Sequence, residues 1–177
     1  MRRRLFSQLL PWFLALSLLP IGAVLLATWQ AQEEFQNERL FADLRARAEL
    51  ARHFLADSIR AGDRNTVQSF LVRALDATGT RLTVIGADGT VWAETHEAVE
   101  IMGNHSDRLE VRAALRGEVG ESRRFSRTLG REVWYVAVPV RGLDGKPMAV
   151  VRAALPDEAV QPLRFRSLFR ILALALA

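Results

Sequence analysis

The chain has 177 residues and a mass of 19.8 kDa, which is enough for one compact domain with its own core. Cysteine is absent, which excludes disulfides, thiolate metal sites and cysteine nucleophiles. The chain carries 24 basic and 20 acidic residues; three of the basic ones are Arg2–Arg4, and beyond them the two signs are interspersed. Nucleic-acid-binding domains concentrate positive charge on one face, so we expect no nucleic-acid partner despite a pI of about 10.8.

The first element predicted along the chain is a transmembrane helix over residues 5–29, preceded by a basic cytoplasmic tail, residues 1–4. No charged residue occurs from Leu5 to Gln32, and about 20 apolar residues are enough for a helix to cross a bilayer. A cleaved signal peptide is the alternative, but its apolar region would be only about 7–15 residues long. Because positive residues stay on the cytoplasmic side, we expect the protein in the inner membrane, with residue 30 onward outside the cytoplasm.

Residues 30–61 are predicted to form one long juxtamembrane helix, since no Gly or Pro precedes Gly62. Apolar residues recur at spacings of three and four along one face of this helix. They are Leu40, Leu44, Ala48, Ala51, Leu55 and Ile59. Such a stripe is typical of packing against the core of the following domain and also of a parallel dimer seam, and the pattern leaves both open.

Residues 62–160 are predicted to form one α+β domain. Asp63 or Asn65 caps a helix over residues 66–76, and a capping box of Asp107 and Glu110 opens a short helix that ends near Leu115. Five segments have strand character, mostly joined by Gly-containing turns. They are residues 81–85, 90–94, 121–129, 132–140 and 147–155. This order predicts a five-stranded antiparallel sheet with flanking helices.

The last predicted element, residues 161–177, is the start of a second transmembrane helix. Arg at a bilayer centre costs about 2.5–3.5 kcal/mol, so Arg164, Arg166 and Arg170 are expected at an interface, with the apolar span beginning at Ile171. The apolar stretch is too short to cross a membrane, so we expect the chain to be a fragment that stops inside this helix. A complete protein that ends in a short amphipathic tail is the alternative.

The sequence contains no recognisable catalytic constellation. His53, His96 and His105 have neither metal-ligand spacing nor a nucleophile motif beside them, so we expect no catalytic residue, no metal site and no cofactor in this chain. The loop around Asn104-His105 is interpreted as a lead-in to the short helix. Trp92 and Trp134 are expected in the core.

The candidate ligand-binding residues are Arg124, Tyr135 and Arg152, which lie on the last three predicted strands. Arg152 interrupts an apolar run, and an unpaired buried charge is very costly. This arginine must therefore pair with a carboxylate, reach solvent or hold an anion. The pattern predicts either a small anion as the ligand or no direct ligand at all, with Arg152 in a structural ion pair with a nearby carboxylate.

Three stretches carry a resemblance to a known family: RLTVIGADGTVWAET, NHSDRLEVRAALRGEVGESRRFSRTLGREVWYVAVPV and the strand that follows them. Between about Arg81 and Leu155 the chain resembles the extracytoplasmic sensor region of phosphate-regulon-type sensor histidine kinases, with Leu109 in place of the family's proline. The resemblance implies a PAS-like, Cache-type fold, a homodimer, and an output kinase that uses ATP and Mg²⁺ and phosphorylates a response regulator. No phosphoacceptor box surrounds any of the three histidines.

Three functions are therefore open. The first is the membrane-anchored sensor part of a two-component histidine kinase, whose catalytic domains lie outside these residues. The second is the same sensor fold on a chemoreceptor or a cyclic-dinucleotide enzyme, because input domains are reused with different outputs. The third is a free-standing anchored periplasmic binding protein.

Overall fold

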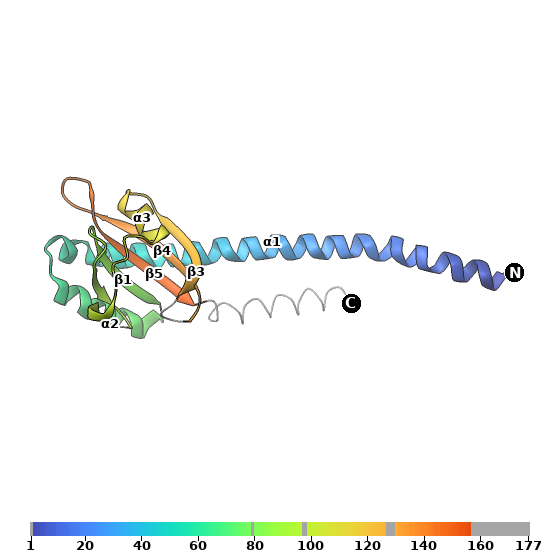
Figure 1. Cartoon of the computed structure of the whole chain (residues 1–177), viewed down its shortest axis with the longest axis horizontal. Coiled ribbons are helices and arrows are strands. Elements are labelled where there is room, and N and C mark those ends of the chain that lie inside the picture. Colours follow the sequence, from blue (N-terminus) through green and yellow to red (C-terminus); the bar gives the residue numbers. More distant parts are fainter. Residues whose placement is uncertain (1, 79, 97–98, 127–129, 157–177) are drawn as a thin grey trace. The chain divides into compact units, whose positions relative to one another are not determined.

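A computed structural model of the chain describes residues 2–78, 80–96, 99–126 and 130–156, with the backbone alone at residues 2–11, 14, 15, 74–78 and 100. Figure 1 shows the long helix α1 (Arg2–Arg60) and the helices and strands that follow it. The chain divides into two compact units, Met1–Leu40 and Phe41–Ala177, and α1 begins in the first and ends in the second. The predicted second transmembrane helix, residues 161–177, lies outside the described residues.

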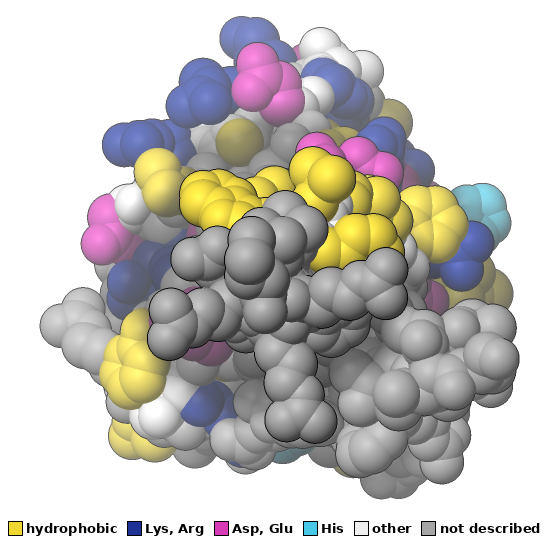
Figure 2. Space-filling model, turned by 90° about the vertical axis from the view of Figure 1, so that its right-hand side faces the viewer, with side chains coloured by type: hydrophobic (Ala, Val, Ile, Leu, Met, Phe, Trp, Pro, Cys, Tyr) yellow, Lys and Arg dark blue, Asp and Glu magenta, His cyan; other side chains and the backbone are white. Residues whose placement is uncertain are grey.

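The first unit is helical in its described part and exposes many large apolar side chains, among them Trp12, Leu19 and Trp29. Figure 2, which looks along α1 from its N-terminal side, shows hydrophobic side chains gathered near the middle of that face. Among the residues whose side chains are described, no helix is both long enough and apolar enough to cross a membrane. Several positions of the predicted first span, residues 5–11, 14 and 15, lie outside that set.

The second unit holds a single described sheet. Its strands are β1 (Arg81–Gly86), β2 (Val91–Glu94), β3 (Gly120–Ser126), β4 (Arg131–Arg141) and β5 (Pro147–Pro156). They lie in the order β2-β1-β5-β4-β3, and each neighbouring pair is antiparallel. The predicted five-stranded antiparallel sheet with flanking helices is therefore confirmed. The hairpins follow the sequence, whereas the pairing of β1 with β5 joins segments that are far apart in the chain.

The part of α1 from Phe41 onward packs on one face of this sheet. The side chains of Leu44, Ala48, Ala51, Leu55 and Ile59 are buried, which confirms core packing for this part of the predicted stripe. The rings of Phe41 and the buried Trp134 meet edge to face, with centroids 5.0 Å apart. Because side chains alternate along a strand, Tyr135 next to Trp134 points to the opposite face.

The opposite face carries the short helix α3 (Leu109–Leu115). Val111 and Ala114 of α3 cluster with apolar residues of the sheet such as Ile85, Ala137 and Val150. Both faces of β4 are thereby covered, which is why its apolar run is continuous rather than alternating. Helix α2 (Arg64–Thr78) lies against β1 and β2, and the side chain of Gln68 donates to the backbone oxygen of Glu94 and accepts from its nitrogen.

The two predicted helix caps have different outcomes. Asp63 caps α2 as expected, because its carboxylate accepts from the backbone nitrogen of Thr66 at 3.1 Å. The capping box of Asp107 and Glu110 is wrong, since α3 begins one residue later than that box requires, with Arg108 at its N-cap and no side-chain cap. The carboxylate of Glu110 instead lies in the protein interior, where it pairs with Arg152 and Arg124.

Candidate functional site

Two arginines from separate strands converge on Tyr135 of β4. The guanidinium carbon of Arg124, on β3, lies 4.2 Å from the centroid of the Tyr135 ring, and that of Arg152, on β5, lies 5.1 Å from it. Arg152 is only 3% exposed. A cation over an aromatic face is favourable, more so when it is desolvated. The aromatic ring therefore helps hold two guanidiniums that would otherwise repel each other.

Glu110 of α3 is the counter-charge of this arrangement. Its side chain is fully buried, and its carboxylate lies 3.1 Å from Nη2 of Arg124 and 3.4 Å from Nη1 of Arg152. Ser122 donates to the other carboxylate oxygen at 2.8 Å. Burial raises the pKa of Glu110, but Arg152, the hydrogen bonds and Arg124 together hold it below its ordinary value. Glu110 is therefore ionised at neutral pH.

A second buried ion pair lies beside the first. Nε and Nη2 of Arg81, on β1, each lie 3.0 Å from a different carboxylate oxygen of Glu94, on β2. This paired geometry is the strong form of an arginine–carboxylate contact. Arg81 also shares its face of β1 with Thr83, whose hydroxyl accepts from Nη2 of Arg152 at 3.3 Å.

The loop before α3 is held on the β1–β2 turn by hydrogen bonds. Nδ2 of Asn104 donates to the backbone oxygen of Asp88 at 2.7 Å, and the backbone nitrogen of His105 donates to the oxygen of Gly89 at 2.9 Å. Gly89 has a positive φ of 82°, and a Cβ there would lie 2.7 Å from the backbone nitrogen of Ser106. Glycine at this turn therefore lets the loop approach closely and places His105 over the sheet.

These elements surround a pocket of about 250 Å³. The sheet contributes the lining residues Arg81, Arg124, Phe125, Ser126, Tyr135 and Arg152. The segment before α3 contributes the lining residues Ile101, Met102, Gly103, His105 and Arg108. The described lining thus holds four arginines and no carboxylate, because Glu94 and Glu110 lie behind it.

Several nitrogen atoms of this lining have no hydrogen-bond partner among the described residues, although each atom is buried. They are Nε of Arg124 and Arg152, and Nδ1 of His105. Nε of Arg108 also lacks a hydrogen bond, but it lies 3.4 Å from a carboxylate oxygen of Asp107. Buried donors without partners are rare in proteins and costly. Guanidinium donors around a small pocket match the planar oxygens of a carboxylate or the oxygens of a phosphate. The pocket is therefore electrostatically and geometrically suited to an anion.

The three predicted ligand-binding residues, Arg124, Tyr135 and Arg152, all line this one pocket. The two readings of Arg152, ion pair and anion holder, are compatible, because it contacts Glu110 with one nitrogen and leaves another unpartnered. Their role toward a ligand stays a prediction.

Sequence reasoning missed Arg81, Arg108, His105 and Glu110. Arg81 could have been found, since it is a charge at the head of an otherwise apolar strand. Glu110 was interpreted as part of a capping box with Asp107, and not as a buried counter-charge. His53 and His96 are exposed, Trp134 is in the core as expected, and Trp92 is half-buried with Arg64 over its ring. In the described ranges, no three of the His, Asp and Glu side chains group to hold a metal ion.

His105 makes the stability of the domain depend on pH. Burial, and then the charges of Arg152, Arg108 and Arg124, lower the pKa of His105 to about 4. The unfolded chain binds a proton near pH 6.5 and the folded chain does not, so stability falls as the pH drops from about 6.5 to 4. With solvent screening of this partly exposed ring, the loss is about 1–2 kcal/mol.

The measurement is urea unfolding at pH 7 and pH 5 for the wild type and for His105→Gln. We expect the variant to lose less stability between these pH values than the wild type. An equal loss in both proteins would assign the pH dependence to other groups.

Solved structures with the same fold are sensor domains. The sensor domain of the Vibrio cholerae histidine kinase DctB has a TM-score of 0.59 and 16% identity, covering 78% of this chain and 58% of that one. The Escherichia coli DcuS sensor domain has a TM-score of 0.57 and 14% identity, covering 75% of this chain and 98% of that one. The ligand-binding domain of the Pseudomonas fluorescens chemoreceptor CtaA, in complex with L-alanine, has a TM-score of 0.55 and 17% identity. The match covers 74% of this chain and 59% of the CtaA chain.

This chain therefore spans about three fifths of the DctB and CtaA domains. No protein-family model matches the chain, and no curated protein matches it. The likeness is one of fold at low identity: the chain has the PAS-like fold that sensor domains of histidine kinases and chemoreceptors share.

Proposed function

We propose that this chain is the ligand-sensing part of a membrane-anchored signalling protein, and that it binds a small anion in the arginine pocket. The observation that carries the proposal is the convergence of Arg124 and Arg152 on one pocket, each with a buried Nε that has no hydrogen-bond partner among the described residues. A purely structural arginine cluster would be expected to satisfy these donors internally. Sensor domains of this fold in histidine kinases and chemoreceptors supply the functional context.

The signal would travel from the pocket through Glu110. An anion that takes hydrogen bonds from Arg124 and Arg152 competes with Glu110, which holds the same two guanidiniums from α3. A ligand changes the state of a protein only by binding one state better than another, typically by 1–3 kcal/mol for coupled sites. Because Arg124 and Arg152 would divide their hydrogen bonds between the anion and Glu110, the contacts between α3 and the sheet would differ between the bound and the free state.

The output we propose is a histidine kinase that uses ATP and Mg²⁺ and phosphorylates a response regulator, with the chain acting as a homodimer. The family resemblance of residues 81–155 supports this output. A chemoreceptor is the second candidate, supported by the chemoreceptor domains of the same fold. The longer gene separates them: a His-box segment with an ATP-binding domain supports the kinase, and a methyl-accepting signalling domain supports the chemoreceptor.

Attachment to the inner membrane, with the sensor outside the cytoplasm, rests on the charge-free run of residues 5–32 and on Arg2–Arg4. Protease treatment of intact spheroplasts tests it. We expect residues 41–156 to be digested from outside while a short N-terminal fragment stays with the membrane. Survival of this part in intact cells, or mature protein that begins after residue 31, would contradict the proposal.

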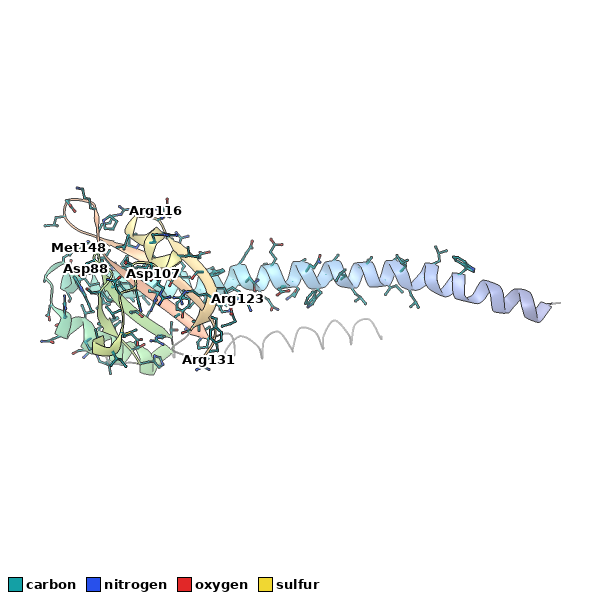
Figure 3. All side chains as sticks on the ribbon, viewed as in Figure 1. Asp88, Asp107, Arg116, Arg123, Arg131 and Met148 are labelled. Atoms are coloured by element: carbon teal, nitrogen blue, oxygen red, sulfur yellow. The ribbon has the colours of Figure 1, made fainter. Side chains whose placement is uncertain are left out.

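Anion binding is tested by thermal shift and calorimetry on the purified 177-residue chain with acetate, succinate, sulfate and inorganic phosphate. We expect at least one of these to stabilise the wild type, and Arg124→Gln to weaken its binding about tenfold or more, since charged hydrogen bonds contribute about 1.5–3 kcal/mol. Arg116→Gln is the matched control, because Arg116 is exposed at the end of α3, outside the pocket (Figure 3).

If Arg124→Gln binds the anion as tightly as the wild type, Arg124 does not take part in anion recognition. A fall in stability of Arg152→Ala without any change in anion binding would likewise make Arg152 purely structural.

A further inference from the structure

We infer that Gln68 of α2 is a positioning residue for the anion pocket, because it holds the guanidinium of Arg81 in place by way of Glu94. This inference rests on the proposed anion-binding function and adds to it a residue that does not line the pocket. Three contacts in series carry it. Gln68 binds the backbone of Glu94, the Glu94 carboxylate binds Arg81, and Arg81 lines the pocket.

The first contact completes the edge of the sheet. Glu94 is the last residue of β2, which is only four residues long and has β1 as its one neighbour among the described strands. Backbone groups on the outer side of an edge strand have no strand to pair with. The backbone nitrogen of Glu94 donates instead to Oε1 of Gln68 at 3.0 Å, and its backbone oxygen accepts from Nε2 at 2.9 Å. One side-chain amide thereby replaces a neighbouring strand and fixes the end of β2.

Helix α2 presents this amide from a packed position. Val67 and Leu71, which lie on either side of Gln68 in the helix, are both fully buried. A group carried by a packed helix is placed more precisely than one carried by a loop. The Glu94 backbone is therefore held against a fixed support.

The Glu94 side chain carries this constraint to Arg81. The carboxylate is buried, and its two oxygens accept from Nε and Nη2 of Arg81, each at 3.0 Å. A two-point contact sets both the place and the plane of a guanidinium. The backbone nitrogen of Thr95 donates to the same carboxylate at 3.0 Å, which fixes the orientation of the carboxylate in turn.

Arg81 is the point at which these contacts reach the pocket. This residue is buried at the start of β1 and is part of the pocket lining. A site gains affinity when a long, rotamer-rich side chain is held in its binding geometry beforehand. Displacement of the Glu94 backbone would release Arg81 from that geometry although no lining residue had changed.

Gln68→Met tests the first contact, because methionine keeps the length and helix propensity of glutamine but cannot form this pair of hydrogen bonds. Dissociation constants for acetate, succinate, sulfate and inorganic phosphate are measured by calorimetry on the 177-residue chain at pH 7. We expect each anion that binds the wild type to bind this variant about threefold to tenfold more weakly. Ser69→Ala is the matched control, because Ser69 is the next residue of α2 and is exposed, and its constants should stay within about twofold of wild type.

A second comparison separates positioning from a general effect on the fold. Arg81→Lys keeps a positive charge beside Glu94 but cannot make the two-point contact. Because Gln68 acts through Arg81, we expect the double variant to bind within about twofold of Arg81→Lys alone. A loss caused by Gln68→Met that is equally large in both backgrounds would show a structural role and overturn the inference.

A third measurement needs no ligand. Nε–H of Arg81 donates to a buried carboxylate, so its resonance in a nitrogen-15 NMR spectrum should exchange slowly with water, and Arg81→Lys assigns it by its loss. We expect exchange at least about tenfold faster in Gln68→Met and unchanged in Ser69→Ala. Unchanged exchange in Gln68→Met would overturn the inference whatever the anion results.

The outcomes separate this inference from the proposed function. If Gln68→Met binds anions as tightly as the wild type while Arg124→Gln binds them more weakly, the inference is wrong and anion sensing stands. Equal losses in Gln68→Met and Ser69→Ala would also contradict it. If none of the four anions binds the wild type, the proposed function fails, and the exchange rate alone then decides whether Gln68 positions Arg81.

Discussion

Replacing Glu110 with alanine lowers the free energy of unfolding by about 3–5 kcal/mol, the cost of breaking a buried ion pair from one side. Glu110 is fully buried, and the change leaves Arg152 and Arg124 without their shared carboxylate and Ser122 without its acceptor. The buried guanidinium of Arg152 and the partly buried one of Arg124 then lie near the Tyr135 ring without a carboxylate between them. The measurement is urea unfolding followed by circular dichroism.

Glu118→Ala is the matched control, because Glu118 is 67% exposed and its ion pair with Arg116 spans 3.5 Å in solvent. A surface pair of this kind contributes about 0–1 kcal/mol. A loss below about 1 kcal/mol in Glu110→Ala would show that the arginines find solvent or other partners, and would contradict the buried network.

The same carboxylate sets an acid limit on stability. The folded-state pKa of Glu110 lies below its ordinary value of 4.5, so its contribution is present above pH 4.5 and is lost as the pH falls through the folded-state value. Glu110→Gln should therefore flatten the stability curve on the acid side of pH 4.5. His105 acts at higher pH, which keeps the two effects apart in one titration.

Gly120→Ala lowers the free energy of unfolding by about 3 kcal/mol, at the upper end of what overpacking costs. A Cβ on Gly120, the first residue of β3, would collide with the backbone carbonyl of Glu110 and lie 2.7 Å from its Cα. Backbone cannot rotate away as a side chain can, so α3 must separate from β3. This separation would also move the Glu110 carboxylate away from the pocket arginines, so anion affinity should change together with stability.

Gly103→Ala is the stability control, because a Cβ there meets nothing within 4 Å and its φ is not in the left-handed region. We expect the free energy of unfolding of Gly103→Ala to stay within about 0.5 kcal/mol of that of the wild type. A Gly120→Ala variant as stable as Gly103→Ala would show that α3 and β3 are not packed closely.

Local signals were sufficient for most of the fold. The apolar stripe that includes Leu44 and Leu55 marked the buried face of α1, and Gly89, Gly130 and Gly145 marked the hairpin turns where φ is positive. Period and turn chemistry act over a few residues, so they can be read from the chain directly.

The same reasoning predicted only part of the site. A charge such as Arg152 within an apolar run signals that a partner or a ligand is needed, and this reasoning selected three residues that line one pocket. The partner could not be selected in that way. Glu110 is 42 positions from Arg152, and Thr83 is 69 positions away, so only the fold brings them together.

From the sequence by itself came the strands, the hairpins, the buried helix face and the need of Arg152 for a negative partner, because each depends on neighbours within a turn or two of the chain. The tertiary structure alone decided that β5 lies between β1 and β4, that Glu110 faces inward instead of capping α3, and that His105 and Arg108 close the pocket from the opposite side. Those outcomes depend on long-range packing and on charges shared between distant segments. No local pattern encodes them, because the energy of a buried charge depends on every group that surrounds it.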